Sequence, residues 1–178
     1  MLPLLWLLTL AAPAHALTQK QAGPYVELGV GGGAAGSPLV GQAGGHLSVG
    51  LWGGTYDDAY SFGRYWSIGL ANRVDYAPGP GVPRIAPMLE VRRGLDVFVA
   101  NTSPFLAGGP LLVVGDEVVT GATARGGLSV KWRRSRFWGV TFRFEGGADF
   151  VADTIAPTFG LYIGGGFARP ARPMDKLK

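Results

Sequence analysis

Apolar side chains occupy every second position in seven segments of this chain, and that period restricts the fold more than any other feature. In segment 25–31, Val26, Leu28 and Val30 share one face, and polar, aromatic or small residues share the other. Successive side chains of a β-strand point to opposite faces, so this period predicts strands. The same alternation occurs in segments 46–51, 65–76 (where Asn72 is the one misfit), 88–100, 122–132, 138–145 and 159–167.

Composition places these strands in a membrane rather than in a soluble domain. Charged residues make up 16% of the 178 residues and hydrophobic residues 47%, whereas about 25% of an ordinary soluble domain is charged. The absence of cysteine excludes a disulfide scaffold, a thiolate metal site and a lipid-anchored lipoprotein. A barrel strand crosses a bilayer in about ten residues, apolar toward lipid and polar or small toward the lumen. We therefore predict an all-β fold, an antiparallel up-and-down transmembrane β-barrel.

The chain divides into four predicted parts. Residues 1–16 form an apolar run ending in Ala14-His15-Ala16, the pattern of a signal peptidase site, and the run is shorter than the roughly 20 residues of a spanning helix. We predict a cleaved signal peptide over 1–16, a lead-in over 17–23, the barrel over 24–167 and a basic tail over 168–178. A buried N-terminal helix is the alternative for the first part. Much of the net charge of +4 lies in the tail, so the sequence does not indicate nucleic acid binding.

Residues 105–114 decide the number of strands. Single-chain bacterial barrels have an even number, so this apolar run is the candidate for an eighth strand, although it does not alternate and Pro110 cannot donate to a ladder. With eight strands and both termini in the periplasm, segments 34–43, 77–86, 116–120 and 151–157 become outer loops, and 55–63, 101–104 and 134–136 become periplasmic turns. Seven strands would permit an incomplete barrel that closes by oligomerising, so the oligomeric state is left open.

The alternating strands and the end of the last one resemble a known family. Phe159, Leu161, Ile163 and Phe167 place apolar residues before a final aromatic residue. In this the chain is similar to the small eight-stranded barrels of the OmpX type and of the OmpA transmembrane domain. The resemblance implies the outer membrane of a Gram-negative cell envelope, contact with outer-membrane lipid, and insertion by the barrel-assembly machinery.

Nine charged residues have inward parity on the predicted strands. An eight-stranded barrel has an interior filled by side chains and no open channel, and an unpaired charge there is costly. We therefore predict an ion-pair network in the lumen, with a lumenal ligand or a proton path as the alternative. The nine are Glu27, Arg73, Asp75, Glu90, Arg92, Asp96, Arg125, Arg143 and Glu145.

His46-Leu47-Ser48 is the one spacing that suggests nucleophilic catalysis. A serine activated by a histidine is a hydrolase device, and an outer-membrane lipid A deacylase family carries a His-x-Ser pair on a barrel strand. Here the parity turns both residues inward, away from acyl chains. His15 leaves with the predicted signal peptide, so we expect no metal site and no cofactor.

Aromatic and basic residues mark the predicted membrane edges. The candidate interfacial anchors are Trp66, Tyr76, Trp132, Trp138 and Phe167. The basic run 131–136 supplies candidates for binding lipid phosphates, Lys131, Arg133, Arg134 and Arg136, and a solvated turn is the alternative. Arg93 has outward parity and should lie near an interface or at a bulge, because arginine facing mid-membrane lipid costs about 2–4 kcal/mol.

Together these features predict an outer-membrane barrel with a structural, adhesion or interaction role, in which outer loops would recognise a protein partner. Two alternatives stay open. One is a lipid A-modifying hydrolase that uses His46 and Ser48, and the other is a soluble exported β-sandwich.

Overall fold

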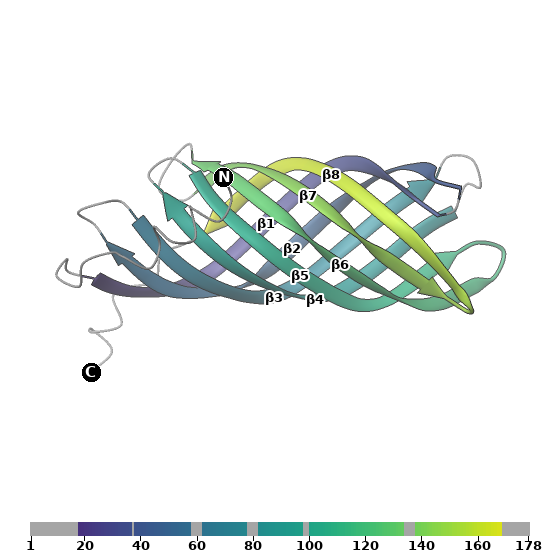
Figure 1. Ribbon diagram of the computed structural model, residues 1–178, viewed down its shortest axis with the longest axis horizontal. Helices are drawn as coiled ribbons and strands as arrows, with labels where there is room; N and C mark the ends of the chain where they lie inside the picture. The colour runs from purple at the N-terminus through teal and green to yellow at the C-terminus, as the bar shows by residue number, and fades with distance from the viewer. Residues whose placement is uncertain are drawn as a thin grey trace.

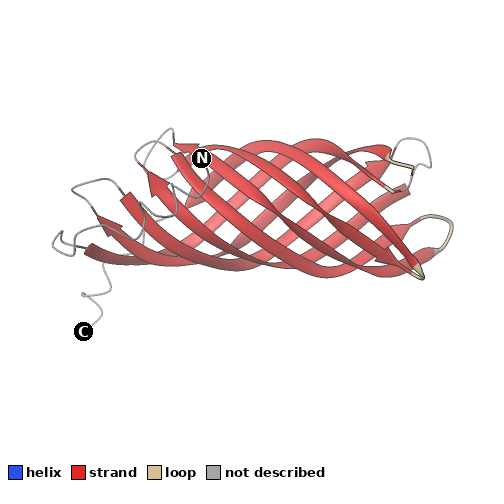
Figure 2. Ribbon diagram, viewed as in Figure 1, coloured by secondary structure: helices blue, strands red, loops and turns tan. Residues whose placement is uncertain are grey.

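Eight antiparallel strands form a closed barrel (Figures 1 and 2). The computed structural model describes residues 18–36, 38–57, 62–77, 82–97, 100–133 and 138–168, and in this part of the chain no helix is long and apolar enough to cross a membrane. The predicted all-β, up-and-down, eight-stranded barrel is confirmed, and the alternative of a β-sandwich is wrong. The strands are β1 (Thr18–Ala35), β2 (Val40–Asp57), β3 (Phe62–Ala77), β4 (Val82–Val97), β5 (Ala100–Val114), β6 (Val118–Arg133), β7 (Trp138–Val151) and β8 (Thr154–Ala168).

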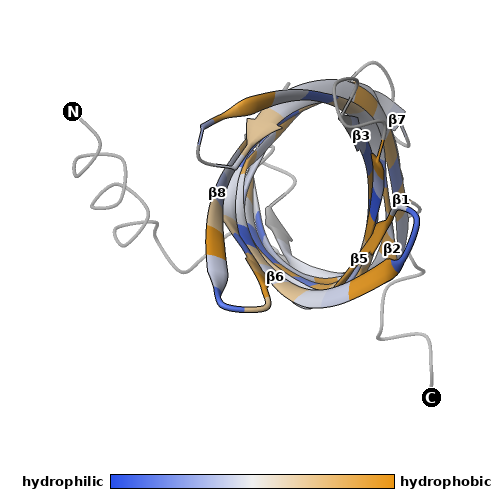
Figure 3. Ribbon diagram, turned by 90° about the vertical axis from the view of Figure 1, so that its right-hand side faces the viewer, coloured by the Kyte–Doolittle hydropathy of each residue, from blue (hydrophilic) through white to orange (hydrophobic). Residues whose placement is uncertain are grey.

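Pairing between β1 and β8 closes the ring, and the view along the barrel shows the strands surrounding a central axis (Figure 3). The cross-strand partners of Tyr25, followed once around the barrel, return to β1 at Ala35, ten residues beyond the start. A stagger of this size in an eight-stranded barrel tilts the strands by roughly 40° from the axis. It also leaves an interior just wide enough for side chains.

The connections define two ends of the barrel. Consecutive strands turn at residues 36–39, 115–117 and 152–153 at what we call the hairpin end, and β1 starts and β8 finishes at the opposite, terminal end (Figure 1). Gly36 adopts a positive φ of 97° in the first of these turns, and its N–H donates to the carbonyl of Pro157 at 3.0 Å. That bond joins the first hairpin to β8.

The hairpin-end connections are shorter than the sequence suggests. Strands extend into all four predicted outer loops, 34–43, 77–86, 116–120 and 151–157, and also into the predicted turn 55–63. Likewise β1 begins at Thr18, within the predicted lead-in. Residues 1–17, 58–61, 134–137 and 169–178 lie outside the described residues, and with them the signal peptide, the turn 134–136 and nearly all of the basic tail.

Segment 105–114, the candidate for the additional strand, belongs to β5. That strand begins at Ala100, so the predicted turn 101–104 is wrong, and the predicted strand 88–100 ends at Val97. Side chains alternate between buried and exposed from residue 103 to residue 107, as a strand with one lumenal face requires.

Prolines account for the wrong prediction of this strand's bounds. The ladder between β4 and β5 has no pairs where Pro87 stands opposite Pro110, and none at Pro104, whereas pairs form on both sides of each break. A proline lacks the N–H that a ladder needs. The strands tolerate these prolines because β5 is fully paired to β6 on its other side.

Gly164 lies where β1 and β8 approach each other closely. A Cβ on Gly164 would collide with the backbone carbonyl of Leu28, whereas a Cβ on Gly165 would meet nothing within 4 Å. We expect Gly164→Ala to lower the free energy of unfolding by about 1–3 kcal/mol, the usual cost of overpacking, and Gly165→Ala to leave it nearly unchanged. Urea unfolding in lipid vesicles, followed by tryptophan fluorescence, measures both variants. Equal stability of the two would contradict the close approach.

Candidate functional site

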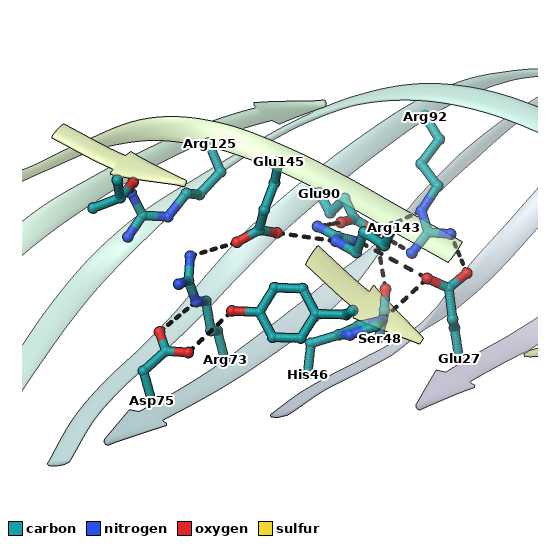
Figure 4. Close-up of polar contacts among 12 residues, drawn as sticks. Glu27, His46, Ser48, Arg73, Asp75, Glu90, Arg92, Arg125, Arg143 and Glu145 are labelled. Carbon is teal, nitrogen blue, oxygen red and sulfur yellow. Dashed lines mark hydrogen bonds and ion pairs between the residues drawn. The ribbon is translucent and has the colours of Figure 1, made fainter. Parts of the chain in front are cut away.

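The interior of the barrel holds a cluster of ionised side chains (Figure 4). The structure places all nine residues of inward parity there, each no more than 7% exposed. Strands far apart in sequence bring them together, since Arg92 bonds to Glu27 across 65 residues. Two further ionised residues join the cluster, Arg84 from β4 and Asp149 from β7.

In the first part of the cluster, two arginines bridge two glutamates. Arg92 Nη1 donates to Glu27 Oε2 at 2.6 Å, and its Nη2 lies 2.6 Å from Glu90 Oε1. Arg143 Nη2 lies 2.7 Å from Glu90 Oε2, and its Nη1 lies 3.9 Å from Glu27 Oε1. Each carboxylate is therefore shared by two guanidinium groups.

Arg143 also connects this part to the next. Its Nε donates to Glu145 Oε2 at 3.1 Å, and Glu145 pairs in turn with Arg73. Arg73 also pairs with Asp75, whose Oδ1 accepts a hydrogen bond of 3.0 Å from the Tyr162 hydroxyl. The ion pairs thus continue from one group to the other without a break.

A third group surrounds Asp149. Arg125 pairs with Asp149 and donates to the Thr158 hydroxyl. Arg84 Nη1 lies 3.1 Å from the other oxygen of Asp149, and the Thr123 hydroxyl donates to Oδ1 at 2.8 Å. This carboxylate accepts from three side chains and is 1% exposed.

The charges of the three groups balance. Five arginines face five carboxylates, so the formal charge of these ten residues is zero; Asp96, which is also buried, is not counted among them. Mutual attraction and hydrogen bonding then offset the cost of removing these groups from water. The members are Arg73, Arg84, Arg92, Arg125 and Arg143 with Glu27, Asp75, Glu90, Glu145 and Asp149.

Aromatic rings cover the flat faces of three of the arginines. The guanidinium carbon of Arg143 lies 3.7 Å from the centroid of the Phe105 ring. Arg92 lies over Tyr25 at 5.0 Å and Arg73 over Tyr162 at 5.4 Å. These contacts add cation–π attraction. They also fill the interior with side chains, as expected for an eight-stranded barrel.

His46 and Ser48 do not form a nucleophile–base pair. His46 Nε2 lies 3.1 Å from Glu27 Oε1, whereas Ser48 Oγ donates to Glu90 Oε1 at 2.9 Å and lies 3.3 Å from the Tyr25 hydroxyl. Ser48 is 0% exposed. A catalytic serine needs a hydrogen bond to its base and an open side for the substrate. Both residues instead belong to the lumenal network, so the geometry does not support the hydrolase hypothesis.

Within the described residues, no three histidine, cysteine, aspartate or glutamate side chains are grouped as metal ligands. A hollow in the wall is lined mainly by Leu128, Phe144, Phe159, Leu161 and neighbouring glycines. These side chains are exposed on the outer face, and their apolar character suits acyl chains rather than a polar substrate.

Sequence reasoning missed Arg84, Asp149 and the three aromatic residues that cover arginines. Arg84 fell in the predicted loop 77–86, which begins with the Pro/Gly-rich stretch 77–83. Asp149 lies beyond the predicted end of its strand, although Glu145 and Asp149 are an even number of residues apart and so share a face. Tyr25 and Phe105 have inward parity too, but parity alone does not show which charge they contact.

The five candidate anchors all lie on the outer face, about half exposed. Trp66, Trp132, Trp138 and Phe167 stand within four residues of the terminal end of their strands, and Tyr76 stands one residue from the hairpin end of β3. Four anchors thus mark an aromatic level near the terminal end, and Tyr76 alone among the five marks a second level near the hairpin end.

The basic residues near the terminal end divide between the two faces. Arg93 lies outside, with its guanidinium carbon 5.5 Å from the centroid of the Trp66 ring. Lys131, a candidate for binding lipid phosphates, instead has inward parity, and its Nζ would lie 3.4 Å from a Cβ built on Gly166. Gly166 is buried, so Lys131 faces the lumen and does not share the outer face of Trp132. Arg134 and Arg136 lie outside the described residues, as does the side chain of Arg133.

Comparison with known proteins finds similarity in fold only. No family model matches the sequence, and no curated protein matches it. Among solved structures, the chain is similar to Ail, the attachment invasion locus protein of Yersinia pestis, in its complex with the heparin analogue sucrose octasulfate. The two are 9% identical, the match covers 85% of this chain and 99% of that chain, and the TM-score is 0.44.

Proposed function

We propose that this protein is an outer-membrane barrel with a structural, adhesion or interaction role and a filled, non-conducting lumen. One observation carries the proposal, the exposure of large apolar side chains all around the wall. Leu28 on β1, Leu70 on β3 and Leu106 on β5 are 59%, 65% and 73% exposed, while arginines and glutamates occupy the interior. A soluble protein would reverse this arrangement, whereas a bilayer stabilises it.

The height of the apolar wall supports the same proposal. Trp66 and Tyr76 lie on one face of β3, and their separation of ten residue steps corresponds to about 33 Å along the strand. At a tilt of roughly 40° this separation is about 25 Å along the barrel axis, the height of the apolar band of outer-membrane barrels. The two aromatic levels would then lie at the two interfaces.

We place the terminal end in the periplasm and the hairpin end outside. The described turns of the hairpin end are short, and their charged residues are Asp116, Glu117 and Asp153. Short turns cross a bilayer more readily than the basic run and basic tail of the opposite end would. Arg133, Arg134 and Arg136 remain our candidates for contact with lipid phosphates on the periplasmic side.

Short turns also bear on the interaction role. With two to four residues in each described turn, a protein partner would meet the hairpin tips and the barrel wall rather than long loops. Insertion by the barrel-assembly machinery, contact with outer-membrane lipid and cleavage of residues 1–16 belong to the same proposal.

Membrane fractionation and gel migration test this function. We expect the protein in the outer-membrane fraction, where it should resist carbonate extraction and migrate differently on a detergent gel before and after boiling. A folded barrel binds less detergent than the unfolded chain, so its mobility changes on heating. Recovery of the folded protein in the soluble periplasmic fraction would overturn the proposal.

The variant Ser48→Ala distinguishes the proposed structural role from the hydrolase alternative. Because Ser48 is buried and bonded to Glu90 rather than to His46, we expect the lipid A of cells producing this variant to match that of cells producing the unaltered chain, by mass spectrometry. A gain or loss of acyl chains that depends on Ser48 would restore the hydrolase hypothesis.

A further inference from the structure

Asn72 interrupts the apolar wall at a level where lipid chains are expected. It lies on the outer face of β3, six residues from Trp66 and four from Tyr76 on the same face, so it stands between the two aromatic levels. The other outward residues of β3 between those levels are Ile68, Leu70 and Val74, all apolar.

The amide of Asn72 is exposed and forms no hydrogen bond within the described strands. Its cross-strand neighbours are Leu47 on β2 and Pro87 on β4. Neither side chain has a polar atom, and Pro87 also lacks a backbone N–H. An amide left unsatisfied in hydrocarbon is costly, because lipid chains offer neither donor nor acceptor.

Between Asn72 and the hairpin end, the neighbouring strand β2 carries only small outward residues. Three outward positions of β2 hold Gly41, Ala43 and Gly45, and the last two pair with Tyr76 and Val74 of β3. A Cβ on Gly41 would meet nothing within 4 Å. Small residues allow two membrane-spanning surfaces to approach closely, and this strip begins at Gly45, diagonal to Asn72.

We infer that the outer face around Asn72 docks a second copy of this chain, with the two Asn72 amides paired across a two-fold axis. This inference rests on the proposed membrane location. A carboxamide carries both an acceptor oxygen and an N–H donor, so two copies satisfy each other by reciprocal hydrogen bonds. A two-fold axis brings the same surface patch of both copies together, and the bare strip of β2 then receives the neighbouring wall.

Disulfide cross-linking in isolated outer membranes tests the interface. The chain has no cysteine, so Asn72→Cys introduces a single thiol. Phe144→Cys is the matched control. Phe144 also faces outward, is 50% exposed and lies six residues from the anchor Trp138 of its own strand. Its strand, β7, lies on the opposite side of the barrel from β3. After mild oxidation we expect a covalent dimer from Asn72→Cys and none from Phe144→Cys. Equal cross-linking of both variants, or none from either, would overturn the interface.

A second measurement tests the Asn72 side chain itself. Dimerisation of the cysteine-free chain in lipid vesicles is followed by energy transfer between labelled copies, for the unaltered chain, Asn72→Gln and Asn72→Leu. Loss of two interchain hydrogen bonds should weaken the dimer roughly tenfold in Asn72→Leu, while Asn72→Gln should largely retain it. An unaltered or strengthened dimer in Asn72→Leu would rule out amide pairing.

Heat-modifiable migration of the same variants separates this inference from the proposed function. A variant that is heat-modifiable and membrane-bound yet monomeric refutes the dimer alone. A chain that is found folded but outside the membrane refutes the proposed location first, and the dimer with it.

Discussion

Replacing Arg143 by methionine will destabilise the barrel by about 3–5 kcal/mol, the cost of breaking a buried ion pair by removing one partner. Arg143 lies within ion-pair distance of Glu90, Glu145 and Glu27, and it is 1% exposed. Without it, four arginines face five carboxylates in the network. The surplus negative charge is buried away from water, so the variant destabilises the folded state and not the unfolded chain.

Urea unfolding in vesicles at neutral pH measures the loss, and Arg93→Met is the control. Arg93 lies on the outer face against Trp66, and we expect its replacement to cost less than about 1 kcal/mol. The double variant with Arg143→Met and Glu90→Gln removes one charge of each sign, so it should recover part of the loss. If Arg143→Met proves as stable as Arg93→Met, the lumenal ion pairs contribute nothing to the fold.

Which residues face the lumen could be predicted from the sequence, because the two-residue period of a strand is local. Glu27 and Arg125 needed only the parity of their own segments. Which residues pair with which could not be predicted this way. Arg92 meets Glu27 because a stagger of ten residues brings β4 and β1 together across the lumen, and no short segment carries that information.

Strand ends were the other failure, and prolines and glycines caused it. Pro83 lies in the predicted loop 77–86 and Pro104 in the predicted turn 101–104. The barrel accommodates both within strands by omitting ladder bonds or by placing them near strand ends. Gly146 and Gly147 broke the alternation after Glu145 and concealed Asp149. Because the strands were predicted too short, the connections between them were predicted too long. For the same reason the surface expected to recognise a partner was placed on long loops.

The geometry of His46 and Ser48 does not support the hydrolase hypothesis, for a reason that the sequence does contain. His46 and Ser48 share a face, as their spacing requires, but sharing the lumenal face places them among carboxylates. Ser48 therefore bonds to Glu90, and His46 bonds to Glu27. Where acidic residues of inward parity are numerous, a histidine and a serine two positions apart are better partners for those acids than for each other.

Leu70→Arg will have the second largest effect, and it tests where the apolar wall lies. Leu70 is 65% exposed on the outer face of β3, four residues from Trp66 and six from Tyr76. Arginine facing lipid near the bilayer midplane costs about 2–4 kcal/mol, but only about 0–1 kcal/mol near an interface. We therefore expect Leu70→Arg to lower the free energy of unfolding in vesicles by the larger amount and Tyr76→Arg by the smaller.

Depth is the main difference between these two positions, because strand, face and introduced side chain are the same. In water the prediction reverses, since an exposed leucine replaced by arginine would lose no buried contact and would improve solubility. Equal losses for Leu70→Arg and Tyr76→Arg in vesicles would therefore show that the wall between Trp66 and Tyr76 does not face lipid. Unequal losses in the expected order would place Leu70 in the hydrocarbon and Tyr76 at its edge, and Asn72, which lies between them on the same face, would then be within or close to the hydrocarbon as well.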